Sequence, residues 1–252
     1  MMSRFIRKAF IPSGVALAAL ALGACDEGRI YPDGGSVEEA ATEVRLEARL
    51  SGAESWPEGY TLSLAAFADG EDYALSSANI APDATATAGA SAGASEGDAG
   101  LYTATLHNLP PSTSTVEICV IDRLRRRVAT FASQPFDPTE RLTVVEADGL
   151  DVSVGEALQR EIFSPTCANC HGGAAFAGAG LHLTPGRSLP ELIGVPSTKD
   201  PAAMRVVPGD ADASLLYEIL TTDASADWAY DHSREIYSQV RLDLIRNWIQ
   251  SL

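Results

Sequence analysis

The residues with the clearest capacity for chemistry are two cysteines and a histidine in the run Cys167-Ala-Asn-Cys170-His171. Two residues between the thiols suit covalent attachment to the two vinyl groups on one edge of a porphyrin. The adjacent histidine then lies under the ring, where its imidazole can bind iron as the proximal ligand. The spacing therefore predicts one covalent haem c, attached through Cys167 and Cys170, with His171 as an iron ligand.

Two other uses of a Cys-x-x-Cys pair fit the sequence less well. A redox-active disulfide switch would be expected in a thioredoxin-like βαβ unit, and this segment lacks that pattern. A structural zinc site needs four ligands, normally from two paired clusters. The chain has no second cysteine pair, and only His107, His182 and His232 could complete such a site. Haem attachment is favoured over both, and over a chance occurrence.

The segment before the motif predicts a helix. Ser153 and Glu156 have the spacing of a capping box, with Ser153 as the N-cap. Apolar residues then recur every four positions and give the helix a buried face, at Val154, Leu158 and Ile162. Pro165 is expected to end this helix just before Cys167, since proline removes a backbone donor.

Two further helices are predicted after the motif. One is expected around residues 214–220, and the other around 238–251, where an apolar stripe includes Leu244 and Trp248. Together with the first helix they predict that residues 153–252 form a compact, mostly helical domain.

These residues also resemble a known family. The segment 162–173 is similar to the opening of a bacterial monohaem cytochrome c domain that is found in many exported lipoproteins. Similar pieces follow in order, at Gly180–Leu183, Val206–Asp210, Ser214–Leu216 and Leu244–Ile249. The whole chain resembles uncharacterised cytochrome c lipoproteins of Bacteroidetes and related bacteria, in which a β domain precedes the cytochrome domain. The resemblance implies a cytochrome c fold, with Trp248 packed where the first and last helices cross.

The same resemblance bears on the distal iron ligand. Domains of this kind usually supply a methionine from a Met-Pro pair shortly before the final helix, and residues 228–235 contain no methionine. His232 lies close to that position, and imidazole is a common haem ligand, so His232 is the predicted distal ligand. Met204 is the alternative. If neither binds, the sixth position would be open to a small gas.

Residues 40–150 have a different pattern, in which apolar and polar side chains alternate. Several such runs, separated by turn-forming pairs, predict about seven short antiparallel strands in an immunoglobulin-like or related β-sandwich. Residues 81–100 are low in complexity and are predicted to form a flexible loop. The predicted fold class is thus a two-domain β + α chain, with the sandwich at 40–150 and a mostly helical cytochrome c domain at 153–252.

The N-terminus has the plan of an export signal. Basic residues precede a short apolar run that ends in Leu22-Gly-Ala-Cys25, and this run is too short to span a bilayer. The sequence around Cys25 resembles the lipobox of bacterial lipoproteins, which implies cleavage before an acylated Cys25. We therefore expect a signal peptide at 1–24 and a tether at 25–39. The protein is expected to be exported and lipid-anchored to the bacterial cell membrane, with either the periplasmic or the outer face possible.

Charge and composition narrow the function. The chain has 18 basic and 34 acidic residues, a net charge of −16, which argues against nucleic acid as a partner. A single haem motif favours one-electron transfer with redox partner proteins of the envelope over an enzyme such as a dihaem peroxidase. The alternative is a haem-containing binding or sensor lipoprotein, whose β domain binds a partner or glycan or whose open haem binds a gas. The basic run 123–127 could dock an acidic partner, although such a run is more often a solvated turn.

Overall fold

The computed structural model describes residues 42–83, 99–173, 177–223 and 230–252. All of them belong to one compact unit, which spans Ala40–Leu252. The predicted signal peptide, the tether and Cys25 lie outside the described residues. Among the residues that are described, no helix is both long enough and apolar enough to cross a bilayer.

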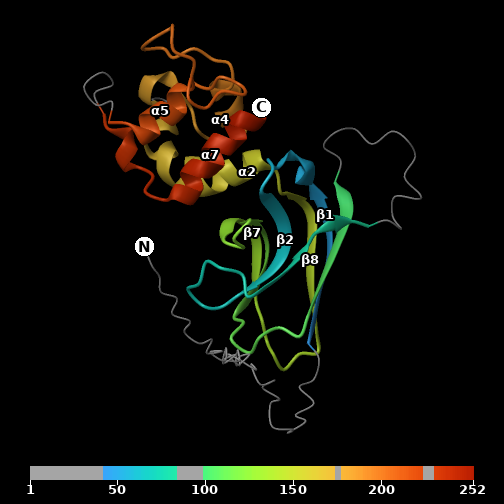
Figure 1. The fold of residues 1–252 in the computed structure, drawn as a ribbon. Helices are drawn as coiled ribbons and strands as arrows, with labels where there is room; N and C mark the ends of the chain where they lie inside the picture. The colour runs from blue at the N-terminus through green and yellow to red at the C-terminus, as the bar shows by residue number, and fades with distance from the viewer. Residues whose placement is uncertain (1–41, 84–98, 174–176, 224–229) are drawn as a thin grey trace, which may run out of the picture. The chain divides into compact units, whose positions relative to one another are not determined.

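Eight strands form two four-stranded sheets (Figure 1). One sheet has the order β4-β5-β1-β8 and the other has the order β3-β2-β6-β7. The strands are β1 (Glu43–Ser51), β2 (Tyr60–Phe67), β3 (Ser76–Asn79), β4 (Ala81–Pro82), β5 (Gly100–His107), β6 (Thr115–Asp122), β7 (Arg127–Pro135) and β8 (Leu142–Asp151). β4 and the start of β5 fall inside the range 81–100 that was predicted as a loop, and residues 84–98 are not described.

Alternation of apolar and polar residues explains which face of β1 is buried. In β1 every second residue is buried, and the inward side chains are Val44, Leu46, Ala48 and Leu50. β2 and β6, the central strands of their sheet, are instead buried almost continuously. Their second face covers a small separate cluster that includes Phe67 and Cys119. Cys119 is fully buried, as expected of a structural cysteine.

The prediction of an all-antiparallel sandwich is wrong at one pair of strands. β1 pairs in parallel with β8, from Glu43 beside Leu142 to Ser51 beside Asp151. The alternation of apolar and polar residues fixes which face of a strand is buried, but it is the same for both pairing directions. Strand direction therefore could not be read from these residues.

The helical segments follow β8. They are α2 (Val154–Leu158), the π-helix η2 (Gln159–Cys167), α3 (Ala168–His171), η3 (Gly178–Gly180), α4 (Ser188–Leu192), α5 (Leu215–Thr221), η4 (His232–Arg234) and α7 (Gln239–Ser251), while η1 (Ala53–Ser55) lies between β1 and β2. The helices predicted at 214–220 and 238–251 are confirmed as α5 and α7. Leu244, Ile245, Trp248 and Ile249 form the buried side of α7.

The predicted mostly helical cytochrome c domain is wrong. The described fold has more strand than helix, 35% against 28%. Between α3 and α7 the helices are short, because Pro and Gly recur along this stretch and interrupt helical hydrogen bonding, at Gly186, Pro196, Pro201, Pro208 and Gly209.

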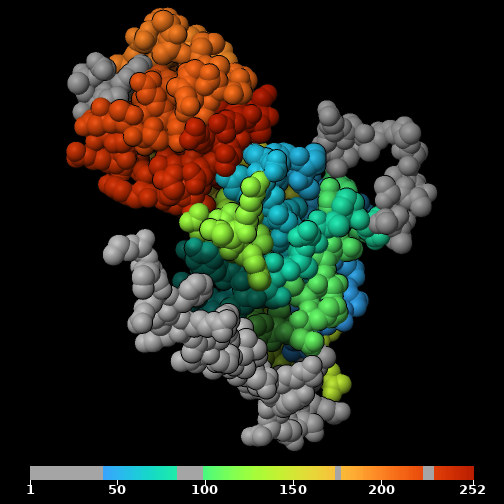
Figure 2. All heavy atoms as spheres, viewed as in Figure 1, coloured from blue at the N-terminus to red at the C-terminus, as the bar shows by residue number. Residues whose placement is uncertain are grey.

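One feature of the core crosses the predicted boundary between residues 150 and 153. One continuous hydrophobic cluster contains residues of β1, such as Leu46, together with Phe163 and Trp248. The C-terminal residues are the red surface in Figure 2. Sandwich and helices thus share one core.

Candidate functional site

The cysteine–histidine motif lies on one face of a helical segment. α2, η2 and α3 follow one another without a break, so Cys167, Cys170 and His171 stand at positions i, i+3 and i+4. Residues at these spacings are neighbours on a helix surface. Both thiols and the imidazole therefore face the same side, which is the arrangement that attachment to one flat group requires.

The start of this segment is capped as predicted, but only by one half of the box. The hydroxyl of Ser153 accepts a hydrogen bond from the Glu156 N–H at 3.1 Å. The N–H of Ser153 donates to a carboxylate oxygen of Asp151 at 2.9 Å. A second contact comes from η1, where the Ser55 hydroxyl accepts the Val154 N–H at 2.9 Å. The helix that carries the motif is thus fixed to the sandwich at its first turn.

Pro165 does not end the helix, contrary to the prediction. It lies inside the π-helix η2, and the Ala168 N–H donates to the Phe163 carbonyl, five residues back. Proline has no N–H and cannot donate a helical hydrogen bond. The π-helix tolerates this missing donor, because its hydrogen bonds span five residues instead of four. Short π segments are rare in proteins, but those that do occur are often found at functional sites. Here the π turn ends at Cys167, the first residue of the motif.

The His171 ring is oriented by backbone carbonyls. Its Nδ1 lies 3.0 Å from the Gly178 carbonyl oxygen and 3.3 Å from that of Leu181. A carbonyl only accepts, so Nδ1 carries the proton and Nε2 keeps its lone pair. This is how metal-binding histidines are commonly held. A Cβ on Gly178 would lie 3.1 Å from Cε1 of His171, so the glycine permits this close approach.

The second imidazole of the site is His232. Its ring centroid lies 6.3 Å from that of His171, and the two planes are inclined by 30°. Two imidazoles that bind one metal ion from opposite sides place their centroids roughly 6 Å apart, from ~2 Å per metal–nitrogen bond and ~1 Å from nitrogen to ring centre. The separation therefore has room for a single metal atom between the rings.

The environment of His232 disfavours protonation of its ring. Burial, and then the neighbouring His171, lower the pKa of His232 below its ordinary value. Nδ1 of His232 is buried and has no hydrogen-bond partner among the described residues. An orphaned buried nitrogen is costly, and a bound metal would satisfy it.

The two thiols differ in their surroundings. Cys170 is exposed, whereas burial, followed by the charges of Glu235 and Cys170, raises the pKa of Cys167 to about 12. A redox-active Cys-x-x-Cys pair works through a thiol whose pKa is lowered. The protonated Cys167 thiol does not fit that use.

Few metal donors gather among the described residues. Within the described ranges, no group of three or more His, Cys, Asp or Glu side chains is arranged to hold a metal ion. A structural zinc site takes four protein donors. A haem iron would take two from the protein, and His171 and His232 are the two imidazoles of this site.

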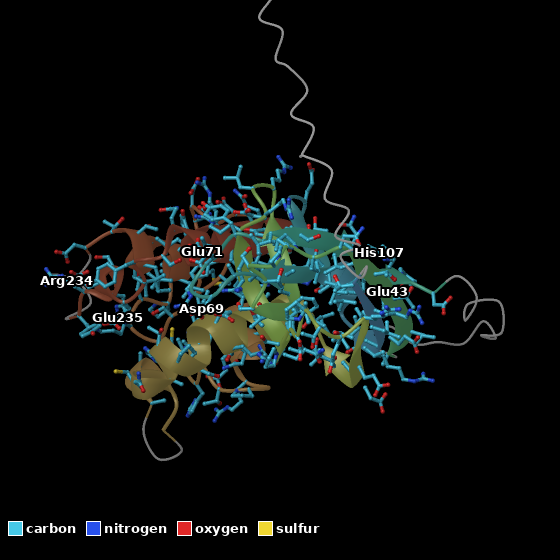
Figure 3. All side chains as sticks on the ribbon, turned by 90° about the horizontal axis from the view of Figure 1, so that it is seen from below. Glu43, Asp69, Glu71, His107, Arg234 and Glu235 are labelled. Atoms are coloured by element: carbon cyan, nitrogen blue, oxygen red, sulfur yellow. The ribbon has the colours of Figure 1, made fainter. Side chains whose placement is uncertain are left out.

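The other predicted candidates have different contacts. Met204 forms an isolated β-bridge with Pro196. The ring of His182 contacts Glu191 at 3.3 Å, a structural role. His107, at the end of β5, is paired with Glu43 of β1 (Figure 3).

The basic run is largely neutralised by its own ion pairs. Arg123 pairs with Glu58 at 2.8 Å, and Arg126 pairs with Asp122 at 3.2 Å. Arg127 is held by the buried Glu117 at 3.0 Å. These pairs fit a structured turn between β6 and β7 better than a free docking patch.

Sequence reasoning missed three residues of the site. Gly178 positions His171, and Tyr230 and Glu235 flank His232. Figure 3 labels Glu235 beside Arg234, next to η4. The glycines that follow the motif were a usable signal for a close backbone approach, whereas nothing in the sequence marked Tyr230 or Glu235.

Comparison with known proteins identifies no family. No protein-family model matches the chain, and no curated protein matches it. A leucine-rich repeat protein from Bacteroides thetaiotaomicron VPI-5482 is a structural match with 13% sequence identity and a TM-score of 0.24. The match covers 45% of this chain and only 12% of that one. A similarity at this level carries no argument about fold or function.

Proposed function

We propose that this chain is an exported lipoprotein that binds one haem c covalently and transfers single electrons at the cell envelope. The observation that carries the proposal is the pair of neighbouring imidazoles, His171 and His232, with ring centroids 6.3 Å apart, His171 being part of the Cys167–Cys170 motif. The separation fits one iron atom between them, and the two thiols fit the vinyl groups at one porphyrin edge.

Attachment uses the reduced thiols of Cys167 and Cys170, both of which are free. Each thiol would add across one vinyl C=C bond of the haem, with the sulfur bonding to one carbon and the thiol hydrogen going to the other, so that no oxidant is needed. Because both cysteines stand on the same helical face as His171, one approach of the porphyrin serves all three residues.

The histidines determine what the site does. When bound, haem supplies one-electron exchange between ferric and ferrous iron. The Gly178 carbonyl fixes the His171 tautomer and the orientation of the ring, which leaves the other nitrogen available to a metal. An imidazole in place of a methionine thioether at the distal position lowers the reduction potential, so this protein would be a better reductant than a His/Met cytochrome. Met204 remains the alternative ligand.

The remaining parts of the proposal concern the cellular location of the protein and its redox partners. Acylation of Cys25 would hold the chain at a membrane, and two or more acyl chains give stable anchoring. Its partners would be redox proteins of the envelope. We keep one alternative, a gas sensor, because loss of His232 from the iron would open a sixth position.

The proposal is tested with the purified, envelope-expressed chain. Haem-stained denaturing gels and visible spectra are compared for the wild type and the Cys167→Ala, Cys170→Ala and His232→Ala variants. The matched controls are Cys119→Ala and His107→Ala, which change the same residue types in the sandwich strands β6 and β5. We expect haem that survives denaturation in the wild type and both controls, with loss of at least one thioether in each cysteine variant.

The spectra separate the ligand hypotheses. A low-spin ferric spectrum that becomes high-spin only in His232→Ala supports ligation by His171 and His232. A low-spin spectrum unchanged by His232→Ala points to Met204. A high-spin wild type supports the gas-binding alternative. A wild-type chain without covalent haem would refute the proposal as a whole.

A further inference from the structure

The segment that carries His232 is too short to fix the ring by itself. η4 spans only His232–Arg234, and a single 3₁₀ turn has little intrinsic stability. Its first turn is closed by Asp231, whose carboxylate accepts from the Ser233 N–H at 3.1 Å and pairs with Arg234 at 2.7 Å. These contacts hold the backbone of the turn, but none of them contacts the imidazole.

The imidazole is restrained by Tyr230. The Tyr230 ring meets the His232 ring edge to face, with centroids 5.0 Å apart and planes at 78°. The Tyr230 hydroxyl donates to the carboxylate of Glu235, the residue that follows η4. This hydrogen bond joins the residue two positions before His232 to the residue three positions after it. It closes a small loop around the ligand, and we name the Tyr230–Glu235 pair the clasp.

Two features indicate that the clasp acts on the ring. His232 has two ring neighbours, His171 at 6.3 Å and Tyr230 at 5.0 Å between centroids, so the closer contact with Tyr230 limits how far the imidazole can turn. Tyr230 is also half exposed, at 51%, and hydrophobic packing alone therefore gives little reason for its fixed position. Nearby Tyr237 is 85% exposed, which makes it a natural comparison.

We propose that Tyr230 is a positioning residue, which, through its hydrogen bond to Glu235, holds His232 toward His171 and so controls how readily an external ligand displaces it. This inference rests on the proposed function, since it concerns the occupancy of the distal position. The clasp would thus determine which ligand occupies the distal iron position. When it is closed, His232 stays bound and electron transfer is favoured, and when it is open, small ligands such as cyanide can bind.

The test in the haem-loaded chain is a titration of the ferric protein with cyanide. Loss of one hydrogen bond to a half-exposed partner increases the fraction with a free sixth position about five-fold. The apparent Kd for cyanide should fall about five-fold in Tyr230→Phe, in proportion to that fraction. Tyr237→Phe should bind as the wild type does. Glu235→Ala should match Tyr230→Phe, and the double variant should add nothing further, because both changes remove the same bond.

A second readout does not need haem. In the Cys167→Ala/Cys170→Ala chain, the imidazole NMR signals of His232 should broaden or shift when Tyr230→Phe is added, and those of His182 should not. Equal cyanide affinities and unchanged His232 signals in Tyr230→Phe would overturn the clasp. A visible spectrum that is the same in the wild type and in His232→Ala would instead refute His232 as the distal ligand. The NMR comparison would still decide whether the clasp restrains the His232 ring.

Discussion

Replacement of Gly52 by alanine should destabilise the protein far more than the same change at Gly70. Both glycines have a left-handed backbone, with φ of +74° at Gly52 and +71° at Gly70. A Cβ at Gly52 would lie 2.5 Å from Cβ and 2.9 Å from Cα of Ser153, whereas a Cβ at Gly70 would meet nothing within 4 Å. The pair therefore separates backbone strain from steric overlap.

The expected magnitudes follow from these contacts. Each alanine in the left-handed region costs about 1 kcal/mol in free energy of unfolding. At Gly52 the overlap with Ser153 adds about 1–3 kcal/mol of overpacking. Displacement of Ser153 also weakens the cap on α2, which costs about 1 kcal/mol. Gly52→Ala should thus unfold with about 3 kcal/mol less free energy than Gly70→Ala.

Urea unfolding, followed by far-UV circular dichroism and by the visible haem spectrum, measures both quantities. The two signals should move together in Gly52→Ala, since one hydrophobic cluster joins the sandwich to the helices. Equal midpoints for Gly52→Ala and Gly70→Ala would refute the steric argument. A shift in only one of the two signals would refute a shared cooperative core.

Two further predictions concern Gly178 and Cys119. In Gly178→Val the new Cβ would press on His171, 3.1 Å from Cε1, so the ferric spectrum should gain a high-spin component. Gly100→Val, whose Cβ would meet the Tyr102 ring at 3.2 Å in strand β5, should not, and equal spectra would contradict the contact. For Cys119, burial raises the thiol pKa above its ordinary value, so the folded chain keeps a proton that the unfolded chain releases at about pH 9 and above. The free energy of unfolding should therefore fall with rising pH there, by up to about 1.4 kcal/mol per pH unit. Urea titrations between about pH 8 and pH 10 measure this slope. An equally steep fall in Cys119→Ala would disprove the linkage.

The elements that the sequence predicted correctly are those with a local signal. Alternating side chains located β1, and the spacing of Leu244, Ile245 and Trp248 located α7. Ser153 marked the start of the helix before the motif, since a cap depends on residues only three positions apart.

Non-local features could not be predicted in this way. The parallel pairing of β1 with β8 joins residues about a hundred positions apart, and nothing in either strand encodes its direction. The helix end predicted at Pro165 was wrong, because a π-helix can contain a residue that has no backbone N–H. The likeness to a cytochrome c domain rested on short matched runs, which say little about how the intervening residues pack.

The same division applies to the site. The motif Cys167–His171 is contiguous, and His232 was proposed from its position before the last helix, which stays a prediction. The carbonyl of Gly178 and the Tyr230–Glu235 bond depend on loop conformations, which have no periodic signature.

The parallel pairing of β1 and β8 also sets a distance. Because both strands run the same way, the chain enters β1 at Glu43 and leaves β8 at Asp151, at the opposite end of the sheet. Nine residues of strand separate these ends by about 30 Å. An antiparallel last strand would have returned the chain to the end where it began. The helical segments that follow β8 therefore begin at the end of the sheet away from Glu43, and the sandwich acts as a spacer between its own first residue and the cysteine–histidine motif.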